Sequence, residues 1–339
     1  MGEQQTVDSW TRSGGSDGPD GPRGLAALVE ALRPAHWIKN GFVAAALLFS
    51  GRFTAGLSWA LTAAAVAAFC MVSSAVYLFN DLCDRRADRL HPAKRRRPIA
   101  SGRLAPPAAG VAAAVLLAAG LGTVAVAELL TAGPRHLLGG HALLVWTAAY
   151  VALQVLYSTW LKRIVFVDVL VVALGFVLRA MAGAAAIAVP VSPWLVICTL
   201  SLCLFIAVTK RRSEIAELSG EALGGARPVN RRYDARQIDL LLTVSTAMAI
   251  LTYALYCLAP RTIHRIGSAH MVWTVPLVIY GLLRFNRLTA GAGPSDPVRV
   301  LVRDRVMWLV LATYGLLCAL IVKLGAHPAV RDILDVGGK

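Results

Sequence analysis

Charged residues are scarce in this chain, and their scarcity argues against most soluble folds. Only 16% of the 339 residues are Asp, Glu, Lys or Arg, whereas 57% are hydrophobic and the mean hydropathy is +0.62. A composition of this kind is typical of a polytopic membrane protein.

Cysteine and histidine patterns that hold metal ions are also missing. The six cysteines include no C-x-x-C pair and mostly fall within apolar runs, so disulfides and a zinc site are not expected. The seven histidines show no metal-ligand spacing either. Residues 1–25 contain little apolar sequence and lack the basic start and apolar core of a signal peptide, which predicts a disordered tail.

Long apolar runs make up most of the remaining chain. A membrane-spanning helix needs about 20 mostly apolar residues. By this criterion the sequence predicts an all-α polytopic membrane protein with nine transmembrane helices, at approximately 38–52, 58–79, 106–130, 140–161, 164–189, 193–209, 238–258, 270–286 and 304–324. We expect one transmembrane domain over residues 26–325, followed by a short extracytoplasmic tail at 326–339.

The formal net charge of +15 is explained by orientation in a membrane and does not predict nucleic-acid binding. The loops at 80–103, 162–163, 210–236 and 284–305 carry 22 Lys and Arg, whereas the loops between them carry 4. The positive-inside rule therefore predicts a cytoplasmic N-terminus and an external C-terminus. Any single loop arginine has an ordinary explanation as a topology signal at an anionic leaflet.

The stretch NDLCDRRADRLHPAKRRRPIASG, residues 80–102, combines acids and bases directly after an apolar run. If the preceding helix continues through it, Asp81, Asp84 and Asp88 share one helix face at i, i+3 and i+7. Three carboxylates so close together repel one another unless a cation lies between them. With Asn80 they form a set of oxygen ligands suited to Mg²⁺, which prefers one or two carboxylates plus substrate phosphates.

This interpretation makes the stretch a site for a metal–diphosphate complex. We expect Asn80, Asp81 and Asp84 to bind the metal, while Lys94 and Arg97 meet the remaining phosphate oxygens. The alternative is a solvated acidic helix end whose ion-pair partners are the neighbouring Arg85, Arg86 and Arg89.

Polar residues recur at the same membrane level in other segments. The candidates for phosphate or substrate contacts there are Lys39, Tyr157, Lys162, Asp168, Lys210 and Arg211. An ionisable residue inside a span is costly and usually faces a cavity or a partner. Each candidate also has a simpler explanation, because Asp168 fits an ion pair with a lysine of another helix and the bases fit snorkelling anchors at helix ends. The basic segment 229–240 either closes over the site or sets topology.

Several of these motifs resemble those of one family. NDLCDRRADR resembles the first aspartate-rich motif, N-D-x-x-D-x-x-x-D, of the UbiA superfamily of intramembrane prenyltransferases, and YSTWLKRIVFVD is similar to its second motif region. LRPAHWIKN, HPAKRRRPIASG, LRAMAGA, TKRRSEIAEL and SDPVRVLVRDRV resemble the branch that transfers a phosphoribosyl group. The resemblance covers about residues 30–320. It departs from the family pattern in the second motif, where Asp168 is a single acid.

The resemblance implies nine helices around a central cavity open to the cytoplasm, and a Mg²⁺-dependent reaction. The donor would be phosphoribosyl pyrophosphate, the acceptor a polyprenyl (decaprenyl) phosphate in the plasma-membrane bilayer, and pyrophosphate the leaving group. Asp81, Asp84 and Asp88 would be the catalytic acids, with Asp88 holding the metal or contacting the ribose. The same resemblance suggests a role in cell-wall arabinan synthesis. The sequence leaves open whether the chain forms a homo-oligomer.

Three other functions compete with this one. A UbiA-type aromatic prenyltransferase would bind a polyprenyl diphosphate through the same acidic motif. A transporter for an anionic metabolite would use the charged mouth as an entry funnel, but the external loops lack a basic vestibule and we find no inverted repeat. A structural membrane scaffold does not explain three acids on one helix face.

Overall fold

The computed structural model describes residues 23–50, 55–90, 94–131, 142–218, 233–291 and 304–324, and these residues contain helices but no strand. In chain order the elements are α1 (Leu25–Leu32), η2 (Pro34–Asn40), α2 (Gly41–Ser50), α3 (Gly56–Leu90), η3 (Lys94–Arg96), α4 (Pro106–Thr131), α5 (Ala142–Thr159), η4 (Leu161–Arg163), α6 (Val167–Ala186), α7 (Pro193–Leu218), α8 (Ala235–Leu258), α9 (Pro260–Ile266), η6 (His270–Thr274), α10 (Val275–Gly291) and α12 (Arg305–Leu324).

Helices occupy each of the nine ranges in which the sequence predicts a span. Seven of them, among the described residues, are long and apolar enough to cross a membrane. The other two, α2 with 10 residues and α10 with 17, are shorter than the usual spanning length of roughly 20. The first predicted span begins as the 3₁₀ helix η2, which has a proline at its start and the polar Lys39 and Asn40 at its end. The all-α polytopic class is confirmed, and the count of nine spans stays a prediction.

Helix α3 carries the aspartate-rich motif beyond the apolar span. It runs unbroken for 35 residues, which at 1.5 Å per residue is about 52 Å and exceeds a hydrocarbon layer of roughly 30 Å. The prediction that the second span continues as a helix through residues 80–88 is confirmed. The last turns of α3 therefore extend past its apolar segment and present acidic side chains at one end of the bundle.

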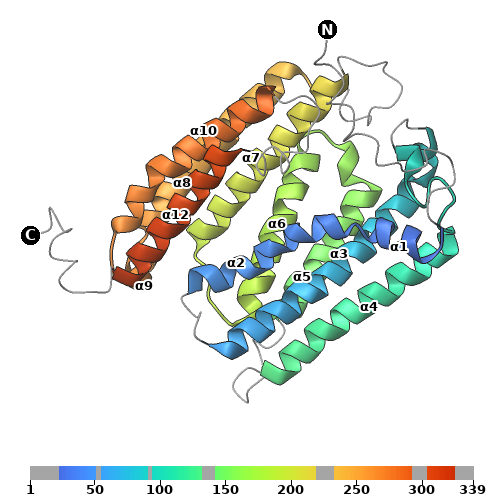
Figure 1. Cartoon of the computed structure of the whole chain (residues 1–339), viewed down its shortest axis with the longest axis horizontal. Coiled ribbons are helices and arrows are strands. Elements are labelled where there is room, and N and C mark those ends of the chain that lie inside the picture. Colours follow the sequence, from blue (N-terminus) through green and yellow to red (C-terminus); the bar gives the residue numbers. More distant parts are fainter. Residues whose placement is uncertain are drawn as a thin grey trace, which may run out of the picture.

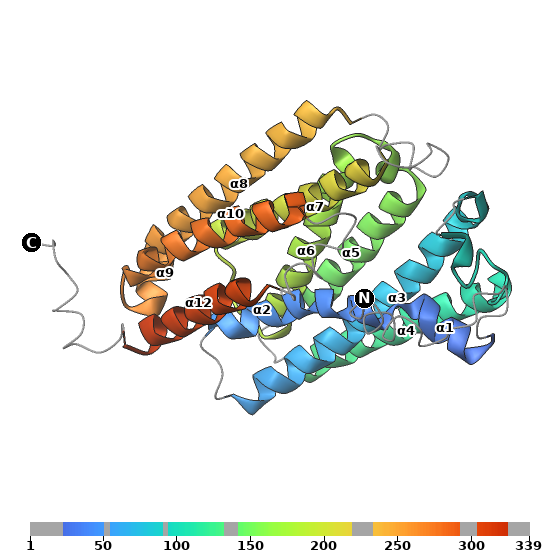
Figure 2. The same cartoon turned by 45° about the horizontal axis from the view of Figure 1, so that its top comes forward.

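The bundle has two sets of helices that meet at α6. In Figures 1 and 2, α1, α3, α4 and α5 lie on one side, α8, α10 and α12 lie on the other, and α2, α6 and α7 lie between them. The core of the first set includes Val43, Phe69, Val124, Tyr150 and Ala182. Helix α2 approaches α6 so closely that a Cβ atom on Gly183 would lie 1.8 Å from the carbonyl oxygen of Val43. This glycine therefore allows the contact between the two helices.

The second set packs around aromatic side chains and leaves a cavity. Phe205 of α7 and Phe285 of α10 have ring centroids 5.7 Å apart, and Met307 of α12 lies in the same core. An apolar cavity of about 460 Å³ lies among α2, α6, α7, α8, α10 and α12, with Phe42, Met181, Phe205 and Met307 in its wall. Its volume falls within the range of about 300–1,000 Å³ that is usual for small-molecule sites.

Candidate active site

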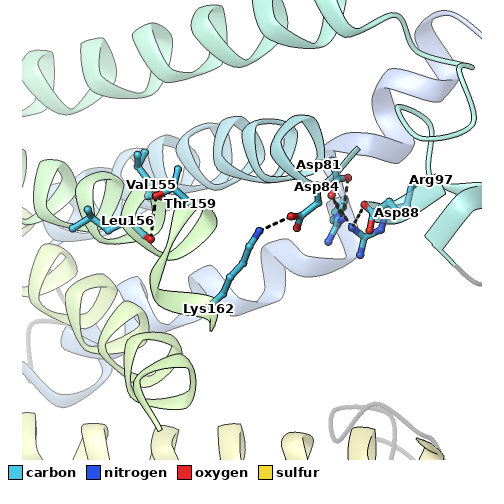
Figure 3. A network of polar contacts seen from close by, with 9 residues as sticks. Asp81, Asp84, Asp88, Arg97, Val155, Leu156, Thr159 and Lys162 are labelled. Carbon is cyan, nitrogen blue, oxygen red and sulfur yellow. Dashed lines mark hydrogen bonds and ion pairs between the residues drawn. The ribbon is translucent and has the colours of Figure 1, made fainter. Parts of the chain in front are cut away.

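The three aspartates of α3 are held by cations from three separate segments (Figure 3). Arg33 donates to both carboxylate oxygens of Asp81, at 2.7 and 2.9 Å. Arg97 donates to Asp81 at 3.0 Å and to Asp88 at 2.8 Å, so one guanidinium group bridges two acids. Lys162 extends from η4 to Asp84, at 2.5 Å. These contacts supply the positive charge that three neighbouring carboxylates require.

The alternative interpretation, a solvated acidic helix end, predicted Arg85, Arg86 and Arg89 as the ion-pair partners of the three acids, and the structure shows other partners. Among the described residues the three acids pair with Arg33, Arg97 and Lys162, whereas Arg89 donates to the carbonyl oxygen of Ala100. Arg89 therefore ties the end of α3 to the segment that follows it. The cluster is a meeting point of distant segments, which a merely solvated helix end would not be.

Arg33 is the site residue that the sequence analysis missed. It ends α1 in the left-handed conformation, with φ 55°, and begins the turn into η2. Its guanidinium carbon lies 5.2 Å from the centroid of the Tyr77 ring. The only local signal is that Arg33 precedes a proline at a helix boundary, and nothing in that pattern indicates a partner 48 residues away.

The remaining candidates lie at different depths around the cluster. Asn80 lies on α3 next to Asp81 and is half-buried. The half-buried residues also include Lys39, Lys94 and Tyr157, whereas Lys210 is exposed. Burial raises the pKa of Asp88, and the positive charge of Lys94 opposes this to a smaller extent. Among the predicted bases, Arg97 and Lys162 contact the three acids directly.

Asp168 lies in a second cluster that is closed to solvent. The residue is fully buried in the first turn of α6, and Arg211 of α7 donates to its Oδ2. The hydroxyl of Tyr233 donates to its Oδ1 at 2.6 Å. Arg211 also donates to Glu214 at 2.6 Å. The expectation of an ion pair with another helix is met, although the cation is an arginine and not a lysine.

Tyr233, just before α8, is the second residue that the sequence analysis did not single out. Burial, and next the hydrogen bond to Asp168, raise the pKa of its phenol. It is the first described residue of the basic segment 229–240, of which residues 229–232 lie outside the described structure.

A third polar group, inside the bundle, belongs to neither cluster. Arg179 of α6 is buried and donates to Asn40 at 3.0 Å, to the hydroxyl of Tyr150 at 2.7 Å and to the carbonyl of Gly175 at 3.2 Å. Its guanidinium carbon lies 4.6 Å from the Tyr150 ring centroid. Asn40 in turn donates to Ser73 at 3.3 Å. This network fixes η2 and α5 against α6, because a buried guanidinium group must keep its acceptors.

The acids of α3 fit a divalent cation that is shared with a substrate. No group of three or more His, Cys, Asp or Glu side chains that could hold a metal ion occurs in the part of the chain that the structure describes. Hard oxygen ligands are nevertheless present, and a carboxylate oxygen each of Asp84 and Asp88 is not used in the bonds to Lys162 and Arg97. This donor set suits Mg²⁺, which keeps phosphate or water ligands and rarely binds in an all-protein cage.

The long apolar helices and the charged cluster define a multi-pass membrane protein with a polar site at one end of its helix bundle. The model of the UbiA prenyltransferase family matches residues 41–311, and the chain belongs to this family. The resemblance of the aspartate-rich motif is thereby confirmed.

Curated relatives that share one name match most of this chain. The chain is 31% identical over 303 residues to decaprenyl-phosphate phosphoribosyltransferase of Mycolicibacterium smegmatis. The aligned region covers 86% of this chain and 90% of the relative. It is 33% identical over 306 residues to the enzyme of the same name from Corynebacterium glutamicum, with 88% and 87% covered.

A solved structure supports the fold. A UbiA homolog from Archaeoglobus fulgidus, bound to GPP and Mg²⁺, superimposes with a TM-score of 0.62 at 19% identity and covers 88% of this chain and 98% of the homolog. At this identity the likeness shows the fold alone.

Proposed function

We propose that this protein is a decaprenyl-phosphate phosphoribosyltransferase. It transfers the 5-phosphoribosyl group from phosphoribosyl pyrophosphate to a polyprenyl phosphate, in the pathway to cell-wall arabinan. The bond from ribose C1 to the pyrophosphate oxygen breaks, a bond from C1 to an oxygen of the lipid phosphate forms, and pyrophosphate leaves. The relatives that carry this name span most of the chain at 31% and 33% identity.

One structural observation carries the assignment of the site. Arg33, Arg97 and Lys162 converge on Asp81, Asp84 and Asp88 from three separate segments. The three cations balance the three carboxylates, and each can pass from a carboxylate to a phosphate oxygen of a substrate, since Lys and Arg both bind phosphate and guanidinium groups bind its oxygens in pairs. The further bases Lys39, Lys94 and Lys210 suit two phosphate-bearing substrates better than a diphosphate and an aromatic acid with a single carboxylate.

The residues divide into two roles. Asn80, Asp81 and Asp84 are the proposed metal ligands, and Asp88 supports them or contacts the ribose. A bound Mg²⁺ would supply neutralisation of the charge that builds on the leaving pyrophosphate. Arg33, Arg97 and Lys162 exchange carboxylate partners for phosphate oxygens when the donor binds.

The second group of proposed contacts surrounds this centre. These residues are Lys39, Lys94, Tyr157 and Lys210, whereas Asp168 and Arg211, which pair with each other in the closed cluster, support the site without touching substrate. The acceptor phosphate is already an oxyanion, so the chain needs no strong general base. Lys and Arg side chains instead align the two anionic substrates and screen their repulsion.

The apolar cavity is the proposed place for the first part of the lipid tail. Its wall is made of side chains such as Phe42, Met181 and Phe205, and it has the size of a ligand site. The rest of a polyprenyl chain would lie in the bilayer. We place the polar site on the cytoplasmic side of the plasma membrane, with nine spans and the C-terminus outside, because the basic loops flank that end.

The direct test is lipid-linked transfer. Membranes that contain the protein are incubated with Mg²⁺, labelled phosphoribosyl pyrophosphate and decaprenyl phosphate, and label is measured in the organic phase. We expect label there, its loss with EDTA, and its return with added Mg²⁺. Transfer from a polyprenyl diphosphate to an aromatic acid, with no label from phosphoribosyl pyrophosphate, would instead support the aromatic prenyltransferase.

A further inference from the structure

Tyr233 joins the start of α8 to the turn between η4 and α6. The side chain is buried, and its hydroxyl donates to Asp168 at 2.6 Å while accepting the backbone N–H of Phe166 at 2.8 Å. The rings of Tyr233 and Phe166 meet edge to face, with centroids 5.6 Å apart. One side chain thus fixes two successive points of this turn.

The turn that Tyr233 holds has an unfavourable backbone conformation. Phe166 has φ 67°, in the left-handed region that bulky side chains rarely adopt, and the residue is 44% exposed. Such a conformation costs on the order of 1–3 kcal/mol and persists only where surrounding contacts hold it. The two hydrogen bonds of the Tyr233 hydroxyl are contacts of this kind.

Lys162 lies on the same turn, four residues before Phe166. Its Nζ is 2.5 Å from Asp84, so this ion pair joins η4 to the acids of α3. The backbone continues from η4 through hydrogen bonds from Ile164 to Leu161 and from Asp168 to Ile164, both 3.1 Å. Backbone hydrogen bonds thus link the neighbours of Phe166 to the segment that carries Lys162.

We propose that Tyr233 is a positioning residue for Lys162: its hydroxyl, bound to Phe166 and Asp168, holds the η4–α6 turn so that the ammonium group stays at the donor site. This inference rests on the proposed function for its consequence in catalysis. The structural part of it does not, because the turn is held in the protein without substrate.

The variant Tyr233→Phe isolates the hydroxyl, because phenylalanine keeps the ring contact with Phe166. Hydrogen–deuterium exchange in detergent gives a readout that does not depend on activity. The amide of Phe166 should exchange at least about tenfold faster in the variant, because it has lost its acceptor. Tyr280→Phe, which removes a tyrosine hydroxyl on α10, should leave this amide unchanged. Unchanged exchange in Tyr233→Phe would overturn the proposal.

Kinetics then test whether Tyr233 acts through Lys162. We expect Tyr233→Phe to raise KM for phosphoribosyl pyrophosphate about tenfold with a smaller change in kcat, and Lys162→Ala to raise it further. The double variant should be no worse than Lys162→Ala alone, because a residue that acts through another adds nothing once that residue is gone. Additive losses would overturn the proposal.

A second variant covers the case in which Tyr233→Phe does not fold. Phe166→Gly takes up a positive φ without strain, so the turn should depend less on the Tyr233 hydroxyl, and Tyr233→Phe/Phe166→Gly should fold with a KM close to that of the wild type. A double variant that does not fold, or whose KM is no closer to the wild type than that of Tyr233→Phe, would contradict the positioning role. A wild-type protein that transfers no phosphoribosyl group would refute the proposed function instead, while the exchange experiment would still decide whether Tyr233 holds the turn.

Discussion

Two acid clusters lie on adjoining elements of the bundle and differ in their access to solvent. In the first cluster Asp84 and Lys162 are 28% and 14% exposed, and the buried Asp81 and Asp88 pair with Arg33 and Arg97, whose side chains are 22% and 24% exposed. In the second cluster Asp168 and Arg211 are 0% and 6% exposed. An accessible pair can exchange its partner for a substrate phosphate or a metal ion at small cost. A closed pair cannot, because separating it leaves a buried charge. The comparison assigns exchange of ligands to the first cluster and structural support to the second.

The largest effect on stability should come from removing one charge from the closed cluster of Asp168 and Arg211. Asp168→Ala leaves Arg211 buried beside Tyr233 without its main carboxylate, which costs about 3–5 kcal/mol. We expect a clear fall in the midpoint of thermal unfolding, measured in detergent.

The double variant Asp168→Ala/Arg211→Met is the control for this prediction, because replacing both charges with apolar groups removes the uncompensated one. It should recover a large part of the lost stability. If Asp168→Ala instead kept its unfolding midpoint but lost transfer activity, Asp168 would belong with the substrate contacts and the contrast between the clusters would fail.

The accessible cluster should show the opposite pattern. Asp84→Ala removes a proposed metal ligand at the half-exposed end of α3, where no core packing is lost. We expect transfer activity to fall by on the order of 10²–10³-fold, as for other groups that stabilise charge in a transition state. The unfolding midpoint should stay near that of the wild type. Turnover at the wild-type rate would exclude Asp84 from the site.

The sequence predicts the acidic face correctly but not what surrounds it. Helical spacing places Asp81, Asp84 and Asp88 together, because i, i+3 and i+7 share a face whatever the tertiary structure. Periodicity and apolar runs likewise place the helices. Arg33 and Tyr233 could not be found in this way, since their partners lie 48 and 65 residues away in the chain. Such pairs depend on how the helices pack, which a single sequence does not encode locally.

A smaller loss of transfer activity should follow from replacing Arg97 with lysine, which changes the shape of the cation and keeps its charge. Arg97 donates from one nitrogen to Asp81 and Asp88, and a lysine there has a shorter, non-planar head group. Arg97→Lys should lower kcat/KM for the donor about tenfold. Arg95→Lys, at an exposed position of η3, is the matched control and should stay close to the wild type. Equal losses in the two variants would mean that the net charge of the segment matters and the bridging contact does not.

The smallest effect should come from Arg96, whose side chain is exposed. Its backbone carbonyl accepts a hydrogen bond from Arg103 at 2.7 Å, and Arg96→Ala keeps that bond. We therefore expect less than about a twofold change in kcat/KM, as for most exposed charges. Activity is best compared at low and high salt, because a diffuse role of the basic segment in attracting the donor would weaken with ionic strength. A loss as large as that of Arg97→Lys would show that the whole basic segment binds phosphate, and Arg96 would then belong to the site together with Arg97.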